Sequence, residues 1–241
     1  MHEPLFIIRA DDRDAEGRLR PEQLEQIVRV LQAPGLVLLP SDTSYSIAAW
    51  LDTAEIRDKI NLVLDRSDDP ISLAFPSMDL VRQWTEPNRI AEGLLKRFTP
   101  GPITVVCRAS RLIPDEVTEE AWRSQNRTLG VRIPNSIEER QVALAGGIPV
   151  TTVAVRDVRG DGTAVTTFAK AIELVQAGMD RIGGTPWCAI EGEIDSSGRT
   201  STVIEVLEDD GNHRIVRENG PISPDDLRAC IAELLQGAAE G

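Results

Sequence analysis

The chain has 241 residues, 41% of them hydrophobic and only 4% aromatic, and its formal net charge is −13. A chain of this length can bury a full core of Val, Ile, Leu and Ala without disulfide bonds or a structural metal. The acidic balance disfavours broad, non-specific nucleic-acid binding, although it does not fix the charge inside a local cleft.

The cysteine pattern and the chain start indicate a reducing compartment. Cys107, Cys188 and Cys230 are far apart and form no Cys-x-x-Cys pair, so neither a zinc ribbon nor a disulfide framework is indicated. The first residues lack the basic and then apolar pattern of a signal peptide. No apolar run approaches the ~20 residues of a membrane helix. We therefore expect a cytoplasmic protein without a metal site or a membrane partner.

In the first half of the chain, strand-like and helix-like patterns alternate. A helix is expected from Pro21, with Leu24, Ile27 and Leu31 at helical spacing and a stop before Pro34. The continuous apolar run at residues 36–39 predicts a fully buried strand. Further strands are predicted at residues 5–9, 46–51 and 71–75, and a further helix at residues 54–64.

The second half continues this alternation. Strands are predicted at residues 103–107, 129–133, 149–155, 202–206 and 213–216, the last two pairing around a turn. Helices are predicted at residues 90–98, 138–145, 168–177 and 224–235, the last capped by Ser223. Residues 156–167 and 183–200 show neither period, which fits binding loops as well as surface insertions. No linker is apparent, so we predict one α/β domain over residues 1–241.

Two segments place polar side chains at strand ends. Residues 40–45, Pro-Ser-Asp-Thr-Ser-Tyr, directly follow the buried strand, at the position where open α/β folds usually bind ligands. The same residue types form ordinary turns, and from these residues alone the turn is the favoured interpretation. Residues 99–104 carry two prolines around a glycine, which fixes a stiff connector that brings Thr104 into the next strand.

Arginines and hydroxyls near other strands suggest an anion site. Arg132 lies within an apolar strand and needs an anionic partner, either a ligand or one of the 39 acidic residues. If it serves a ligand, Arg132→Ala should remove anion binding and leave the fold nearly intact. Ser201 and Arg217 are the groups a phosphate site uses when no Gly-rich loop is present. The GxGxxG, Walker, HExxH and GxSxG motifs do not occur, which disfavours serine and zinc hydrolases.

Taken in order, seven sequence blocks resemble the YrdC/YciO family of threonylcarbamoyl-AMP synthases. The blocks are residues 40–45, 66–73, 100–104, 130–134, 147–152, 201–204 and 216–220. The resemblance implies an α/β fold of the YrdC/RibB-like type, a twisted mixed sheet with flanking helices around a deep cavity. The core of this single domain would span about residues 20–225.

The resemblance also implies a reaction and a set of binding residues. Typical members combine L-threonine, bicarbonate and ATP into threonylcarbamoyl-AMP and pyrophosphate, for tRNA modification. ATP would be a substrate, accompanied by Mg²⁺, and double-stranded RNA is a partner that the net charge of −13 argues against. No catalytic residue is assigned. The binding residues implied are Ser41, Tyr45, Arg66, Thr104, Arg132, Thr152, Ser201 and Arg217, and five of them, Ser41, Thr104, Arg132, Ser201 and Arg217, are expected to converge on one cavity.

Two departures from the family pattern put the activity in question. The Lys-x-Arg pair of typical synthases is replaced by Leu64-Asp65-Arg66, and Ser-x-Asn by Ala154-Val155-Arg156. The YciO branch also departs at Ser-x-Asn, so the chain is placed nearer that branch. A missing cation beside a triphosphate predicts slow or absent pyrophosphate release. The alternatives are carbamoyl-adenylate chemistry on another substrate, with Arg156 meeting a new anion, or a non-catalytic nucleotide- or RNA-binding protein.

Overall fold

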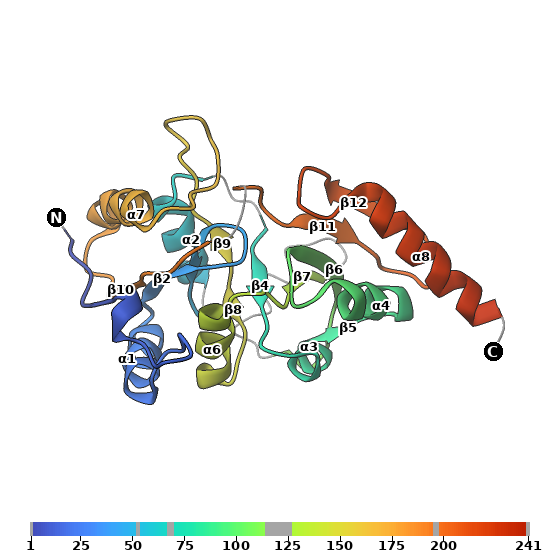
Figure 1. The fold of residues 1–241 in the computed structure, drawn as a ribbon, viewed down its shortest axis with the longest axis horizontal. Helices are drawn as coiled ribbons and strands as arrows, with labels where there is room; N and C mark the ends of the chain where they lie inside the picture. Colours follow the sequence, from blue (N-terminus) through green and yellow to red (C-terminus); the bar gives the residue numbers. More distant parts are fainter. Residues whose placement is uncertain (1, 52–53, 67–69, 114–126, 195–197, 240–241) are drawn as a thin grey trace.

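The computed structural model describes residues 2–51, 54–66, 70–113, 127–194 and 198–239, which form two mixed β-sheets with helices around them (Figure 1). Sheet A has the strand order β1-β10-β2-β3-β9. Its strands are β1 (Ile7–Ile8), β10 (Trp187–Ile190), β2 (Leu36–Pro40), β3 (Tyr45–Ala48) and β9 (Val153–Ala154). The first three run parallel to one another, and β3 is antiparallel to both of its neighbours.

Sheet B has the order β12-β11-β6-β7-β4-β8, with the short β5 paired to β6. The strands of sheet B are β12 (Arg214–Arg217), β11 (Thr202–Glu205), β6 (Ile103–Ala109), β7 (Thr128–Arg132), β4 (Ser72–Ala74), β8 (Val150–Thr151) and β5 (Thr85–Glu86). Parallel pairing joins β11 to β6 and β4 to β7, whereas β6 and β7 are antiparallel.

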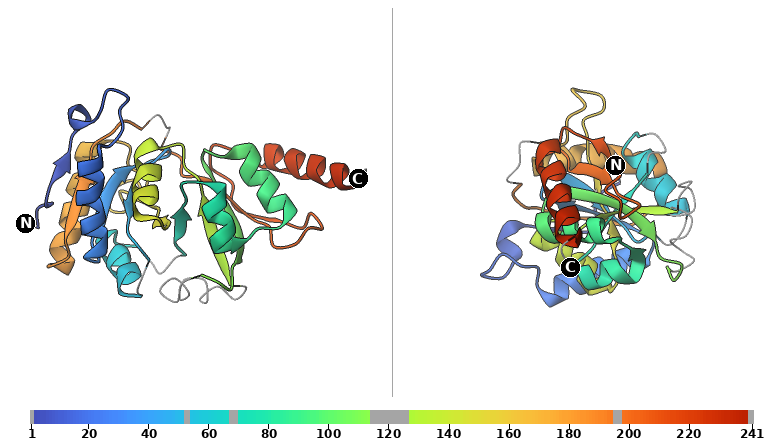
Figure 2. Two further views of the ribbon diagram at one scale, coloured as in Figure 1. Left: turned by 90° about the horizontal axis from the view of Figure 1, so that it is seen from below. Right: turned by 90° about the vertical axis from the view of Figure 1, so that its right-hand side faces the viewer.

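Helices pack at both ends of this arrangement. They are α1 (Pro21–Gln32), α2 (Ala54–Val63), α3 (Met78–Trp84), α4 (Arg89–Phe98), α6 (Ile137–Gly146), α7 (Phe168–Ile182) and α8 (Pro224–Ala239). Near sheet A, α1 contacts α6 and α2 contacts α7, and near sheet B, α4 contacts α8. Figure 2 shows that α8 lies at the end of the long dimension opposite the N-terminus. Helix α6 touches both β2 of sheet A and β4 of sheet B, so it links the two sheets.

The two faces of sheet B differ in character because strand side chains alternate. Val105 of β6 and Val131 of β7 are paired in register, fully buried and part of the main apolar core. Their neighbours along the strands, Thr104, Gly130 and Arg132, therefore belong to the opposite face. One face of the sheet holds the core, and the other is lined by small and polar residues.

Most predicted elements are confirmed, two predictions are wrong, and two elements were not predicted. Residues 183–200 were expected to lack regular structure but contain β10, whose four side chains are all buried between β1 and β2. The single strand predicted at residues 149–155 is two strands, β8 in sheet B and β9 in sheet A, so the chain crosses between the sheets at Thr152. Helix α3 and strand β5 were not predicted.

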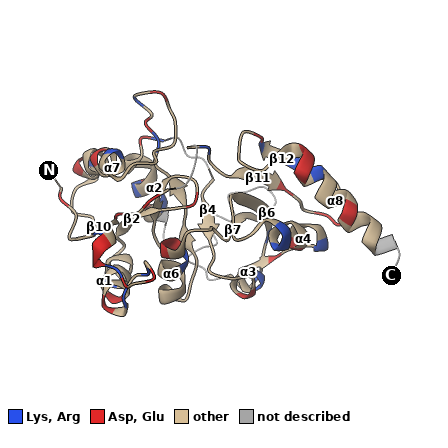
Figure 3. Ribbon diagram, in the orientation of Figure 1, with Lys and Arg blue, Asp and Glu red and all other residues tan. Residues whose placement is uncertain are grey.

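Charged side chains of both signs lie on the outer helices. Lys or Arg and Asp or Glu occur together on α1, α4, α7 and α8 (Figure 3). The three cysteines are free and buried. Within the part of the chain that the structure describes, no helix combines the length and apolar character needed to cross a membrane.

Candidate functional site

The polar face of sheet B is formed by small side chains in close contact. A Cβ atom added at Gly130 would lie 2.7 Å from the Ser72 Oγ and 3.3 Å from the Thr104 Cγ2, so all three residues share this face. The stiff connector before β6 lies beside this face, because the Gly101 N–H donates to the Ile133 carbonyl at 2.9 Å. The connector is thereby anchored to the end of β7, beside Arg132.

Three of the predicted residues meet at the start of β11. The Thr104 and Ser201 hydroxyls hydrogen-bond at 2.8 Å, and both residues are buried. The exposed Arg217 of β12 donates from Nη1 to the Ser201 carbonyl at 3.1 Å. A guanidinium and two hydroxyls therefore lie together at one edge of the polar face, a combination suited to phosphate oxygens.

Arg132 forms a buried ion pair with Asp42, in the loop that follows β2. The two side chains are 5% and 7% exposed, and Arg132 Nη2 donates to the Asp42 Oδ1. Arg132 Nη1 also donates to the Thr152 Oγ1 at 3.3 Å. The loop of sheet A is therefore tied to the polar face of sheet B, and Arg132 has a structural partner whether or not it binds a ligand.

Ser41 contacts a buried carboxylate that the sequence did not single out. Its Oγ donates to the Glu139 Oε2 at 2.5 Å, and Glu139 lies in the first turn of α6 with no exposed surface. Burial raises the pKa of the Glu139 carboxyl above its ordinary value of 4.5, against the opposing effects of the Arg132 charge and the Ser41 hydrogen bond. The nearby Asp42 charge raises the pKa further.

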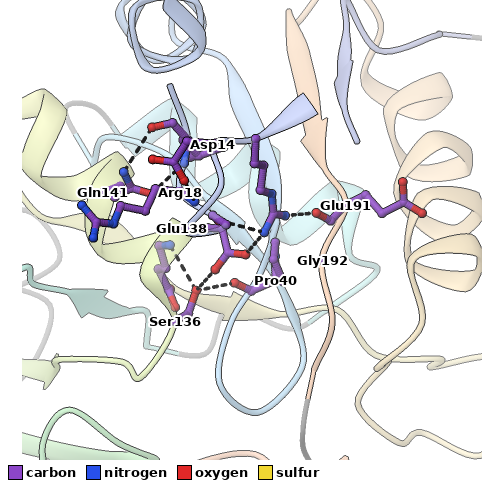
Figure 4. A network of polar contacts seen from close by, with 12 residues as sticks. Asp14, Arg18, Pro40, Ser136, Glu138, Gln141, Glu191 and Gly192 are labelled. Atoms are coloured by element: carbon purple, nitrogen blue, oxygen red, sulfur yellow. Dashed lines mark hydrogen bonds and ion pairs between the residues drawn. The ribbon is translucent and has the colours of Figure 1, made fainter. Parts of the chain in front are cut away.

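A second polar network lies beside this loop and joins it to the N-terminal segment (Figure 4). Arg13, whose side chain is 8% exposed, forms an ion pair with Glu138 and donates to the Glu191 carbonyl. Ser136 donates from Oγ to the Pro40 carbonyl at 2.7 Å and also contacts Glu138 at 3.2 Å. The N-terminal segment, α6 and the residue preceding Ser41 are thus held in one set of contacts.

Tyr45 is placed differently from the other predicted residues. Its hydroxyl donates to the Gly192 carbonyl at 2.5 Å and accepts from the Gly192 N–H at 3.0 Å. The side chain is fully buried, and its ring lies 5.8 Å from that of Phe168. Burial raises the pKa of the Tyr45 hydroxyl. Tyr45 therefore fastens β3 to the end of β10.

Arg66 lies directly after α2, half-buried, with its backbone N–H donating to the Asn61 carbonyl at 3.0 Å. Residues 67–69 of its sequence block lie outside the described residues. Arg156 is exposed and donates to the Gly162 carbonyl and to the Thr200 Oγ1, both at 3.2 Å. Thr200 precedes Ser201, so Arg156 lies at the same end of β11 as Arg217.

Two residues of this site were missed by sequence reasoning. Asp42 was noted only as a turn residue, and its partner Arg132 is 90 residues away. Glu139 follows Ser136 by three positions, a pattern that predicts a capping box at a helix start. Ser136 does accept from the Glu139 N–H at 3.1 Å, but the Glu139 carboxylate contacts Ser41. The capping pattern explains Glu139 as part of a helix start and gives no indication of its contact with Ser41.

The fold and the site define a mixed α/β protein with a polar sheet face flanked by arginines. A model of the family Sua5_yciO_yrdC, described as "Telomere recombination", matches residues 29–219. The chain therefore belongs to the Sua5/YciO/YrdC family. It is 28% identical over 130 residues to the threonylcarbamoyl-AMP synthase of Bos taurus and 20% identical over 137 residues to YciO of Escherichia coli. These matches cover 54% and 56% of this chain, and 45% and 65% of the two relatives, less than two thirds of either.

Solved structures show the same fold at low sequence identity. The structure of P. abyssi Sua5 complexed with L-threonine has a TM-score of 0.73 at 22% identity, covering 94% of this chain and 61% of that chain. The structure of E. coli YciO has a TM-score of 0.69 at 18% identity, and the match covers 89% of this chain and 95% of the YciO chain. The predicted YrdC/YciO resemblance and the mixed α/β fold are thereby confirmed.

Proposed function

We propose that the protein binds ATP and an amino acid on the polar face of sheet B and joins them as a carbamoyl-adenylate. The observation that supports this proposal best is a group of three residues on the same face of the sheet as Arg132, formed by Thr104, Ser201 and Arg217. The first group suits phosphates, and a guanidinium such as that of Arg132 suits a carboxylate. P. abyssi Sua5 has been solved in complex with L-threonine, and HypF in a phosphate- and nucleotide-bound form, which supports the two kinds of ligand.

The chemistry follows from these ligands. The amine of the amino acid takes up bicarbonate, forming a carbamate and releasing water. A carbamate oxygen then attacks the α-phosphorus of ATP, and pyrophosphate leaves. Arg217 and the two hydroxyls would bind the phosphates, and Arg132 would orient the carboxylate. Mg²⁺ would accompany the phosphates, because this ion usually binds through substrate phosphates and water with few protein ligands.

The altered motifs bear on the rate of this reaction. Leu64, at the position of the family lysine, is buried at 7% exposure, and Ala154 lies in β9 without a hydrogen-bonding side chain. The triphosphate would therefore lack the charge of the family lysine and the hydrogen bonds of the Ser-x-Asn side chains. We infer a slow reaction, with L-threonine or another amino acid as the acceptor.

The proposal predicts that Arg217 contributes to ATP binding, and a substitution at this residue tests it. Arg217→Ala should weaken ATP binding by about ten-fold or more, because a charge-assisted hydrogen bond contributes roughly 1.5–3 kcal/mol. Arg214→Ala is the matched control, since Arg214 lies on the same strand but pairs with Glu205 at 3.2 Å. Isothermal titration of both variants with ATP measures the difference, and pyrophosphate release with L-threonine and bicarbonate then tests the chemical step. Wild-type protein that does not bind ATP would contradict the proposal.

A further inference from the structure

The burial of Glu139 is not explained by the start of α6. In a capping box, the glutamate three residues after the cap turns back to the backbone N–H of the cap residue. Glu139 instead extends toward the loop after β2, where it accepts from Ser41 at 2.5 Å. Its side chain has left the helix end and entered the site described above.

The charges around Glu139 do not balance among the described residues. Two carboxylates, Asp42 and Glu139, face one guanidinium, that of Arg132. The neighbouring Glu138 is neutralised separately, by Arg13 on the N-terminal segment. A buried carboxylate without its own counter-ion is costly, and such groups concentrate at functional sites.

Two buried polar atoms at this point have no hydrogen-bond partner in the described part of the chain. They are the Oε1 atom of Glu139, an acceptor, and the Nε atom of Arg132, a donor. The residues themselves are 0% and 4% exposed. A ligand that presented a cationic donor to the first atom and an anionic acceptor to the second would satisfy both.

We propose that Glu139 is a specificity-determining residue that binds the α-ammonium group of the amino acid whose carboxylate faces Arg132. This inference rests on the proposed function, because it assumes that the site takes an amino acid. A ligand ammonium would supply the positive charge that the cluster lacks and the donor that Oε1 lacks. A hydroxy acid of the same shape would supply only a neutral donor.

Ligand selectivity tests the assignment. L-Threonine is compared with the hydroxy acid that carries a hydroxyl in place of the α-ammonium, by isothermal titration in the presence of saturating ATP. We expect wild-type protein to bind L-threonine at least ten-fold more tightly than the hydroxy acid, and Glu139→Gln to lose most of this preference. The Gln side chain is close in size and keeps an acceptor for the Ser41 hydroxyl, so the fold should survive.

Glu138→Gln is the matched control, because Glu138 is the adjacent residue of the same helical turn. It pairs with Arg13, so the substitution should lower the melting temperature and leave the ligand preference unchanged. A Glu139→Gln variant that keeps the wild-type preference overturns the inference. Wild-type protein that binds ATP but does not prefer L-threonine overturns the inference alone, whereas protein that binds neither ligand overturns the proposed function as well.

The pH dependence of stability gives a second test. The groups facing Glu139 are Asp42 in the loop after β2, Arg132 on β7 and the neutral hydroxyls of Ser41 and Thr152. Burial raises the Glu139 pKa, so the folded state binds a proton at this carboxyl more tightly than the unfolded state does. The contribution of this proton to the free energy of unfolding is therefore complete below the ordinary pKa of 4.5 and is lost as pH rises through the folded-state pKa. The Glu139→Gln variant does not lose stability in this way, because the Gln side chain does not titrate.

We therefore expect the melting temperature of ligand-free Glu139→Gln to rise relative to wild type as the pH is raised from below 4.5 to neutral pH. Saturating L-threonine should reduce this difference in melting temperature between the variant and wild type, since a bound ammonium stabilises the charged Glu139. Thermal unfolding of both proteins across this range measures the effect. A difference that does not change with pH, or that L-threonine leaves untouched, contradicts the assignment.

Discussion

Replacing Arg132 with Ala should lower the free energy of unfolding by about 3–5 kcal/mol, the usual cost of removing one partner from a buried ion pair. Asp42, only 7% exposed, would lose its partner, and Glu139 would lose the positive charge that opposes its burial. This result differs from the sequence-based expectation that Arg132→Ala leaves the fold nearly intact. The reason is that the expectation could not include the Asp42 contact.

Urea or thermal unfolding measures the loss, with Arg29→Ala as the control. Arg29 is 74% exposed and pairs with Glu25 at 3.8 Å, so its removal should hardly change stability. Adding Asp42→Asn to Arg132→Ala should recover part of the lost stability, because the double variant no longer buries an unpaired carboxylate at residue 42. If the single variant is as stable as wild type, the ion pair does not hold the loop against sheet B.

Replacing Gly178 with Ala should also destabilise the protein strongly. Gly178 lies in α7 where it crosses α2, and a Cβ atom there would lie 2.1 Å from the Val63 carbonyl oxygen. That neighbour is backbone, so the two helices must move apart, and overpacking of this kind costs about 1–3 kcal/mol or more.

Gly237→Ala provides the opposite result for comparison. Gly237 also lies inside a helix, α8, but a Cβ atom there meets nothing within 4 Å. The change should stabilise the protein by up to about 1 kcal/mol, because Ala favours the helix over Gly. Melting temperatures of both variants distinguish the two cases, and a harmless Gly178→Ala would show that the contact between α2 and α7 tolerates a methyl group.

The sequence predicts those elements whose signal is local. The buried run of β2 and the apolar spacing of α1, ended at Pro34-Gly35, give both elements near their observed bounds. Strand β10 was missed because a parallel strand buried on both faces has no alternation, and its four residues lie within a polar stretch. The crossing at Thr152 was missed because two adjacent short strands resemble a single longer one.

The site follows the same rule. Ser201 and Thr104 were recognised by residue type and by their place at strand starts, and they are in contact. The partner of Arg132 had to be chosen among 39 acidic residues, and no local pattern marks Asp42. Glu139 carries a local signal, but that signal describes the helix end and not the contact with Ser41, 98 residues away.

The two sheets meet at the contact between the loop after β2 and the face of β7. Asp42 lies in the loop after β2 of sheet A and Arg132 lies on β7 of sheet B, so a ligand bound between this loop and the face of β7 would hold the two sheets together. Its binding free energy would be added to the folded state alone, by mass action. Resistance to proteolysis would then rise with the supply of the proposed amino-acid and nucleotide ligands and fall when either is scarce, which would couple the amount of this protein in the cell to those ligands.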